Sequence, residues 1–194
     1  MGYGSCPIAL APTLPDLLAP NLRLVFIGTA AGAHSARVGA YYAKPGNKFW
    51  PTLHAVGLTP TLFAPHDFPQ LIALGIGLTD LSKTGAGMDH QIAPESFDAP
   101  SLRAKLARYA PRAIAFTSKR GAALYQNCAT SDLAYGRQPD EPGAPACFVL
   151  PSPSGAAGPH WRIEPWAALA DWFHAQSPSP LVGEGGSARQ RRDG

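Results

Sequence analysis

An aspartate set among apolar and small polar residues is the first candidate for chemistry. Asp80 lies in the stretch Gly77-Leu78-Thr79-Asp80-Leu81-Ser82-Lys83. A carboxylate in such surroundings can orient or deprotonate a water molecule, and it can stabilise positive charge on a reacting atom. Asp80 could instead be a loop residue that caps a turn or pairs with Lys83, and the sequence leaves this alternative open.

His34 is the second candidate, because an imidazole titrates near neutral pH and can donate a hydrogen bond or hold a water molecule. It ends the run Gly28-Thr29-Ala30-Ala31-Gly32-Ala33-His34. The alternative is a loop histidine without a chemical role. The other histidines have no mutual spacing that suggests a metal, so the sequence predicts no metal site.

The cysteines do not indicate a cofactor. Cys6, Cys128 and Cys147 are odd in number, widely separated and without a C-x-x-C pair, which argues against a disulfide framework and a zinc site. An iron–sulfur cluster would need about four thiolates. We therefore expect reduced thiols, no cofactor and a cytoplasmic protein that joins the nucleoid when it acts.

Composition and charge set wide limits. The chain of 194 residues is 45% hydrophobic and 15% charged, as in a soluble globular protein, and its 21 prolines and 20 glycines indicate many turns and loops. No run approaches the roughly 18 apolar residues of a membrane span, so we expect no membrane contact. The net charge of +3 permits nucleic-acid binding but does not by itself indicate it.

Strand and helix signals alternate along the chain, the strands as short β-rich runs and the helices as apolar residues three or four apart. The predicted strands span residues 22–28, 113–117 and 147–150, and the predicted helices span residues 47–56, 67–74, 101–109, 121–128 and 163–176. This alternation predicts an α/β fold, a single-domain three-layer α/β/α sandwich around a central, mostly parallel sheet of four to five strands.

Three regions follow from the same pattern. Residues 1–20 carry four prolines and are expected to form an N-terminal arm on the surface, residues 21–176 form the domain, and residues 177–194 are too poor in apolar residues to be ordered. We expect a monomer. Ligands of such sheets bind beyond the carboxyl ends of the strands, which points to the loops 28–47 and 151–158.

Both loops resemble motifs of a known family. Gly28 and Gly32 bound the first loop, Tyr42 is its aromatic residue and Pro45-Gly46-Asn47-Lys48-Phe49-Trp50 closes it, while the second loop reads Leu150-Pro151-Ser152-Pro153-Ser154-Gly155. These stretches are similar to the motifs G-I-N-P-G, P-x-N-x-F-W and L-P-N-P-S-G of the uracil-DNA glycosylase superfamily, most of all in its mismatch-specific uracil/thymine branch. The resemblance covers about residues 22–176.

The resemblance implies a pocket for a base that has been flipped out of DNA. Tyr42 would be its aromatic wall, Phe49 would also contact the base, and Asn47 would bind the imide edge of the base. Backbone amides around Thr29 and Ala30 would hold a base carbonyl as negative charge develops. Tyr42 could instead be a half-buried core residue, and Asn47 could serve only as a helix N-cap.

The resemblance also implies DNA contacts from the second loop and from two lysines. Small residues would let the backbone approach the phosphates, and a wedge at residues 156–157 would fill the gap left by the base. The residues concerned are Ser152, Ser154, Gly155, Ala156, Lys48 and Lys83. The alternatives are an ordinary turn and solvated surface charges.

The sequence departs from the family at the residue expected to position water. The asparagine of G-I-N-P-G falls on Ala30, and that of L-P-N-P-S-G falls on Ser152. The first loop is also similar to G-x-A-P-A-x-H of a branch whose members carry four cysteine ligands, which this chain lacks. Asp80 lies in the stretch that matches the family's G-x-T-x-L, so Asp80 is the first predicted catalytic residue. His34, in the first loop, is the second.

The implied activity is monofunctional hydrolysis of the N-glycosidic bond of uracil, or of a related deaminated base, in DNA, which leaves an abasic site. A second hypothesis is a reader that binds damaged or abasic DNA without catalysis. A third is a small-molecule α/β hydrolase or nucleotide-binding module, which would leave Tyr42 and Asn47 unexplained.

Overall fold

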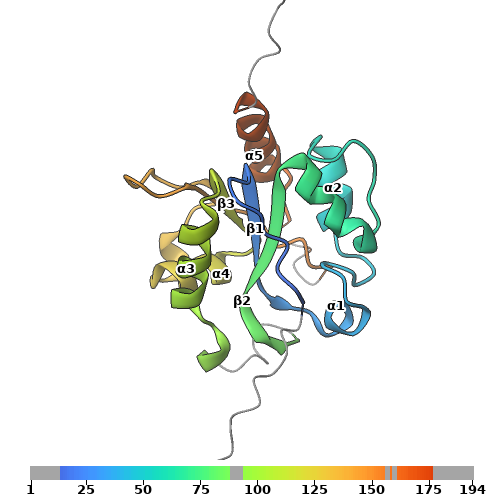
Figure 1. The fold of residues 1–194 in the computed structure, drawn as a ribbon, viewed down its shortest axis with the longest axis horizontal. Coiled ribbons are helices and arrows are strands. Elements are labelled where there is room, and N and C mark those ends of the chain that lie inside the picture. The colour runs from blue at the N-terminus through green and yellow to red at the C-terminus, as the bar shows by residue number, and fades with distance from the viewer. Residues whose placement is uncertain (1–13, 88–93, 156–157, 159–160, 177–194) are drawn as a thin grey trace, which may run out of the picture.

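The fold is an α/β sandwich with one five-stranded sheet (Figure 1). The computed structural model describes residues 14–87, 94–155, 158 and 161–176. The strands are β1 (Leu24–Ala31), β2 (Ile76–Ala86), β3 (Ala113–Phe116), β4 (Gly136–Arg137) and β5 (Ala146–Val149). The α-helices are α1 (Ala33–Val38), α2 (Phe49–Ala55), α3 (Ala99–Tyr109), α4 (Lys119–Gln126) and α5 (Glu164–Ala175), and the 3-10 helices are η1 (Pro65–Leu74), η3 (Pro94–Ser96) and η4 (Thr130–Asp132).

The sheet has the strand order β2-β1-β3-β5-β4, and only the β4–β5 pair is antiparallel. This confirms the predicted mostly parallel sheet. Pairing of β1 with β3 ends at Ile27, whereas its pairing with β2 continues to Ala31. The end of β1 therefore extends beyond β3, and the two strands β1 and β2 carry the sheet furthest in that direction.

Alternate residues of β1 face two separate hydrophobic layers, as expected when successive side chains of a strand point to opposite faces. Leu24 and Phe26 belong to the layer that contains α2, η1 and α5. Val25 and Ile27 belong to the layer with α3 and α4. Figure 1 shows these two sets of helices on opposite sides of the strands. Because helices cover both faces of the sheet, the strands are apolar on both.

An aromatic cluster links the sheet to α2 and α5. The Phe26 ring stacks on Trp166 at 5.7 Å between centroids and meets Phe49 edge-on at 5.3 Å. The indole Nε1 of Trp166 also donates a hydrogen bond of 3.2 Å to the carbonyl of Pro151. Trp166 therefore fixes both the core and the chain that leaves β5.

Several elements differ from the sequence-based prediction. The strand predicted over residues 22–28 continues to Ala31, so the first loop begins at Gly32 rather than at Gly28. Strands β2 and β4 and the short helix α1 were not predicted. The helix predicted over residues 67–74 is the 3-10 helix η1, which begins at Pro65 after the N-cap residue Ala64, and the Asp67 carboxylate accepts a hydrogen bond of 2.9 Å from the Ala64 amide.

The described part of the predicted N-terminal arm is built into the fold rather than laid on its surface. Leu14 is buried in the layer of α2 and α5. Leu17 and Leu78 exchange two backbone hydrogen bonds of 2.9 Å as an antiparallel bridge. Residues 14–17 therefore cover the outer edge of β2, which would otherwise present unpaired backbone groups. The remainder of the arm and the predicted tail 177–194 lie outside the described residues.

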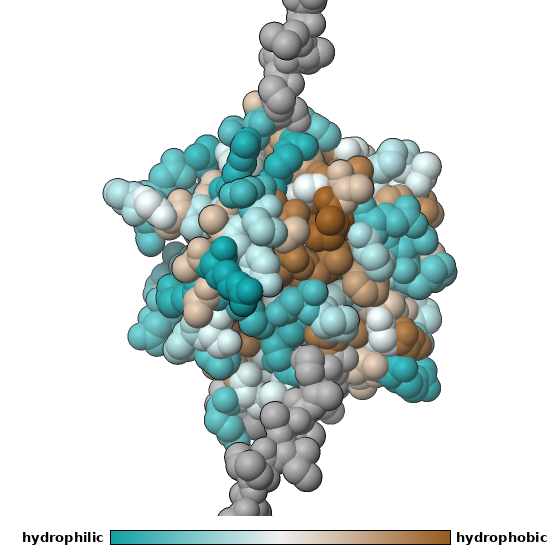
Figure 2. All heavy atoms as spheres, in the orientation of Figure 1, coloured by the Kyte–Doolittle hydropathy of each residue, from teal (hydrophilic) through white to brown (hydrophobic). Residues whose placement is uncertain are grey.

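Figure 2 shows that hydrophilic residues cover most of one face of the molecule, with a hydrophobic patch near its centre. None of the helices in the described part of the chain has both the length and the apolar character needed to cross a membrane.

We expect Trp166→Ala to lower the free energy of unfolding by about 3–5 kcal/mol, because it empties a large buried volume and removes the hydrogen bond to Pro151. Urea denaturation followed by circular dichroism measures this loss. Ile163→Ala is the matched control at the start of the same helix, since Ile163 is 42% exposed, and should change the stability by less than about 0.5 kcal/mol. Equal losses in the two variants would contradict the assigned core.

Candidate functional site

A cavity of about 710 Å³ opens where the carboxyl ends of the parallel strands meet. Its lining comes from the end of β1 with the start of α1, the chain before α2, Asp80 of β2, and the residues that follow β3 and β5, together with Leu14 and Gly87. The extension of β1 beyond β3 leaves Thr29, Ala30 and Ala31 beside this space. The cavity therefore lies where the strand order predicts a ligand site.

Asp80 is buried at this cavity and lies opposite Gly28 in the β1–β2 register. A Cβ atom on Gly28 would come within 2.2 Å of the Asp80 Oδ1 atom. The carboxylate therefore occupies space that only a glycine leaves open. Burial raises the pKa of Asp80 to about 6, although the nearby Lys83 ammonium opposes the shift. Asp80 is a strand residue rather than a loop residue, and it lies 4.0 Å from Lys83, as the alternative of a pair with Lys83 expects.

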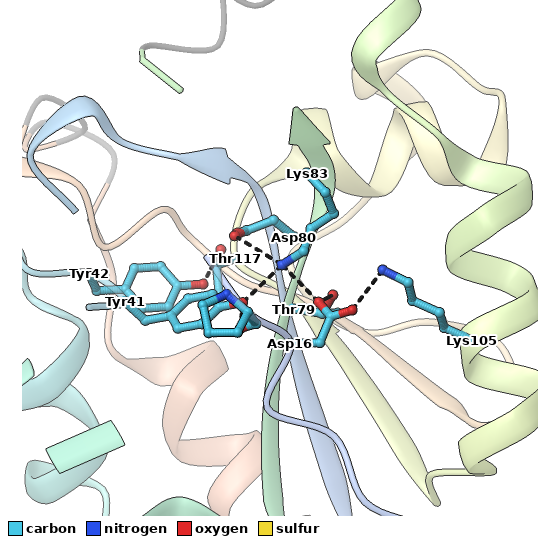
Figure 3. Close-up of polar contacts among 9 residues, drawn as sticks. Asp16, Tyr41, Tyr42, Thr79, Asp80, Lys83, Lys105 and Thr117 are labelled. Atoms are coloured by element: carbon cyan, nitrogen blue, oxygen red, sulfur yellow. Dashed lines mark hydrogen bonds and ion pairs between the residues drawn. The ribbon is translucent and has the colours of Figure 1, made fainter. Parts of the chain in front are cut away.

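Lys83 does not point to the surface but joins a group of buried and half-buried charges (Figure 3). Its Nζ atom lies 2.7 Å from Asp16 Oδ1 and 4.0 Å from Asp80 Oδ2, and it donates to the Tyr41 hydroxyl at 3.1 Å. The other Asp16 oxygen lies 2.7 Å from Lys105 Nζ. The structure thus places Lys83 beside the carboxylates, and its contact with DNA stays a prediction.

Tyr42 and Phe49 form a stacked pair, with ring centroids 3.8 Å apart and an interplanar angle of 16°. Tyr42 lines the cavity, and its hydroxyl is 3.2 Å from Thr117 Oγ1. Phe49 is fully buried and is not part of the lining. Phe49 therefore supports Tyr42 from behind, and its buried position does not fit the predicted direct contact with a base.

Asn47 lines the cavity and also binds the first residue of α2, whose N-cap is Lys48. Its Oδ1 atom accepts a hydrogen bond of 2.9 Å from the Phe49 amide. This contact orients the side-chain amide, so that α2 binds Oδ1 and not Nδ2. Asn47 is therefore not the N-cap itself, and its hydrogen bond to α2 orients an amide whose N–H groups are donors.

His34 lies on α1 at the cavity, and its Nδ1 atom is 3.0 Å from Arg37 Nη2. A guanidinium can only donate, so Nδ1 must accept. A neutral His34 therefore carries its proton on Nε2. At Nε2, the neutral imidazole is therefore a hydrogen-bond donor rather than an acceptor.

The loop after β5 is tied to the loop before α2. The Lys48 amide donates a hydrogen bond of 2.8 Å to the Pro153 carbonyl. Ser152 and Ser154 line the cavity, whereas Gly155 packs near the Gly46 carbonyl. The Lys48 ammonium lies 5.0 Å from the Trp161 ring centre. Ala156 lies outside the described residues.

The structure thus gathers most of the predicted site residues around one space. Those in the lining are Thr29, Ala30, His34, Tyr42, Asn47, Asp80, Ser152 and Ser154. The predicted residues outside the lining are Phe49, Lys48, Lys83 and Gly155. The structure shows positions, and the roles of these residues remain predictions.

Sequence inspection missed Thr117, Ser118 and Asp16. Thr117 and Ser118 line the cavity directly after β3, and Ser118 Oγ lies 2.9 Å from Thr29 Oγ1. The rule that ligands bind after parallel strands, applied to a third predicted strand, would have found these two hydroxyls. No sequence signal marked Asp16, because its partners are far away in the chain. Within the described ranges, no three His, Cys, Asp or Glu residues are grouped so that they could hold a metal ion.

Comparison with known proteins adds to this geometry. The sequence model described as the Uracil DNA glycosylase superfamily matches residues 15–172. Among solved structures, the chain is similar to a candidate uracil DNA glycosylase from Methanosarcina acetivorans, determined by solution NMR. The two are 27% identical, the match covers 83% of this chain and 96% of the other, and the TM-score is 0.57. The matched region runs from the segment of Asp16 into α5 and includes Tyr42, Asn47 and Asp80.

We expect Gly28→Ala to lower the free energy of unfolding by about 1–3 kcal/mol, because the new methyl group overlaps the Asp80 carboxylate. Gly32→Ala is the matched control, since no atom lies within 4 Å of the added Cβ and the residue has a φ of −65°. Thermal and urea denaturation of both variants measure the difference. A Gly28→Ala variant as stable as Gly32→Ala would contradict the close approach of Asp80 to β1.

Proposed function

The chain belongs to the uracil DNA glycosylase superfamily, and from this premise we propose that it flips uracil, or a related deaminated base, out of DNA and hydrolyses its N-glycosidic bond. The product is an abasic site, and the protein acts as a monomer without a cofactor. Its motifs favour the mismatch-specific branch, in which Ala30 makes it an atypical member. The observation that carries this proposal is the buried Asp80 carboxylate at the wall of a cavity that also presents Tyr42 and Asn47.

The proposed reaction uses Asp80 as the general base. Its carboxylate accepts a proton from a water molecule while the water oxygen forms a bond to C1′ of the sugar and the bond from C1′ to the base nitrogen breaks. Positive charge develops on the sugar in the transition state, and the same carboxylate stabilises it. The pKa of about 6 supports this role, because such a group is ionised at neutral pH yet basic enough to take a proton.

The departing base leaves with negative charge, which hydrogen-bond donors can stabilise. Asn47 offers its Nδ2 amide, because α2 already holds Oδ1. His34 offers Nε2–H in its neutral form, because Arg37 occupies Nδ1. The Tyr42 ring, backed by Phe49, supplies a flat apolar wall for stacking. Each group would thus act on the base, whereas Asp80 acts on the sugar and water.

Ala30 favours a second candidate, a reader that binds damaged or abasic DNA. Its methyl group lines the cavity where the family motif has an asparagine, and it cannot position water. The two candidates share the pocket and differ in whether Asp80 performs chemistry.

Base release from oligonucleotides separates these candidates. The panel carries uracil, hypoxanthine, xanthine and mismatched thymine, in single and double strands, and abasic product is detected by alkaline cleavage. We expect release from at least one deaminated base, with the same rate in EDTA. Folded protein that binds these duplexes but releases no base would support the reader and contradict the enzyme.

We expect Asp80→Asn to lower the single-turnover rate of base release about a hundredfold or more, the usual contribution of a general base. The variant should fold, because burial already disfavours the charged form of this side chain. DNA binding, followed by fluorescence anisotropy, should persist. Asp171→Asn is the matched control, since Asp171 is exposed on α5 and does not line the cavity. Unchanged base release in Asp80→Asn would contradict the role of Asp80.

The rate of base release should depend on pH through the same carboxyl group. Below a pH of about 6 Asp80 takes up a proton and can no longer act as a base, so the single-turnover rate should fall as the pH decreases through about 6 and level off above about 7. Rates measured from pH 4.5 to 8.5, with circular dichroism to verify folding, test this. A rate that stays constant down to pH 4.5 would contradict it.

A further inference from the structure

An alternating chain of charges passes around the outer edge of the sheet next to Asp80. It runs from Asp80 through Lys83 to Asp16 and ends at Lys105 of α3 (Figure 3). Of these four residues, only Asp80 lines the larger cavity. The other three therefore could not touch a base or sugar bound there, yet they are connected to the carboxylate that could.

The distances between these four charged groups are unequal. Lys83 Nζ lies 2.7 Å from Asp16 but 4.0 Å from Asp80, so its ammonium is held mainly by Asp16. Asp16 is itself fixed by Lys105 at 2.7 Å and by the Thr79 hydroxyl at 2.6 Å. The side chains of Lys83, Asp16 and Lys105 are only 17–29% exposed. Solvent therefore screens these charges less than it screens charges on an open surface.

We propose that Asp16 and Lys105 are positioning residues for base release: Asp16 keeps the Lys83 ammonium from pairing closely with Asp80, and Lys105 balances the charge of Asp16. This inference rests on the proposed function, because it explains how a carboxylate beside a lysine remains an effective base. A close ion pair with Lys83 would make Asp80 a poor proton acceptor, since an opposite charge favours the ionised form of a carboxyl group.

The arrangement predicts opposite consequences for the two residues. Loss of the Asp16 charge removes a negative neighbour and frees Lys83 to approach Asp80, so the pKa of Asp80 should fall. Loss of the Lys105 charge leaves Asp16 less compensated, so the pKa of Asp80 should rise. The charge of each residue acts on Asp80 in the direction that these shifts require, because Asp16 raises the pKa of Asp80 and Lys105 lowers it.

Other ionisable groups near Asp80 do not reproduce this pattern. Tyr41 and Tyr42 face it from the chain before α2, and burial raises the pKa of both phenols, so they stay neutral. Glu95 and Asp98, from η3 and the start of α3, line a smaller cavity of about 260 Å³ that Asp80 also borders. Neither of these two acids is replaced in the test below, so their influence is constant.

The test compares Asp16→Asn with Lys105→Met. We expect the acid limb of the pH–rate profile to move to lower pH by about half a pH unit to one pH unit in Asp16→Asn. It should move to higher pH by a similar amount in Lys105→Met. Asp171→Asn and Arg108→Met are matched controls that remove one charge of the same sign, the latter from the same helix α3. Lys105→Arg should restore the wild-type profile, because it keeps the charge.

A second measurement makes the result independent of activity. The carboxyl carbon of Asp80, assigned by comparison with Asp80→Asn, is titrated by NMR in each variant and should show the same opposite shifts. The inference is wrong if the acid limb of the pH–rate profile and the NMR titration of Asp80 stay at their wild-type pH in both variants. It is also wrong if they move in the same direction in both variants. If Asp16→Asn does not fold, the upward shift in Lys105→Met and its absence in Arg108→Met decide alone. Opposite NMR shifts in a protein that releases no base would overturn the proposed function and leave the electrostatic coupling standing.

Discussion

The Asp80 carboxylate lies against the backbone of Gly28 on the neighbouring strand, and much of the site follows from keeping it there. Burying an ionised carboxylate is unfavourable unless other groups compensate. Here burial raises the pKa from 3.8 to about 6, so the folded state loses stability as the pH rises through this range, and the full cost remains at higher pH. The chain accepts this cost and places Lys83 at 4.0 Å, near enough to offset part of it but not to neutralise the carboxylate. A glycine on β1 is the condition for this geometry, because any Cβ would displace the carboxylate.

The wall opposite Asp80 depends on the hydrophobic core rather than on charge. Tyr42 stacks on Phe49, Phe49 meets Phe26 and Trp166, and Trp166 binds the Pro151 carbonyl. One continuous aromatic cluster therefore joins the chain before α2 to the chain after β5. The hydrogen bond from the Lys48 amide to the Pro153 carbonyl is a second link between these two segments. Because rigid packing supports both loops, little conformational freedom would be lost on binding a base between them.

The sequence allowed the layered fold and the two loops to be predicted, because both depend on local patterns. The strand at 113–117 and the helices near α3 and α5 appeared within a few residues of their observed bounds. Strand β2 was missed because Gly77, Thr79 and Ser82 weaken its hydrophobic pattern, although its residues from 76 to 82 are all buried. Asp16 was missed for a different reason: its partners Thr79, Lys83 and Lys105 lie more than 60 residues away. The antiparallel bridge between Leu17 and Leu78 brings Asp16 next to β2. Tertiary contacts of this kind leave no local signal.

Strand register connects Ala30, which falls on the asparagine of the similar motif, with the buried aspartate. Gly28 pairs with Asp80, and Ala30, two residues further on, points to the same face of the sheet as Gly28. With strands about 4.8 Å apart and a rise of about 3.3 Å per residue, the Cα atoms of residues 30 and 80 are separated by roughly 8 Å. A polar side chain at either position would therefore extend into the same part of the cavity, and a small residue at position 30 leaves that space to the carboxylate. On the proposed function, the water-directing group has moved from the end of β1 to β2, and a carboxylate, unlike an amide, can also accept the proton. Such a change makes the reaction depend on the ionisation of one group, and the charges around the sheet edge would then become part of the catalytic design.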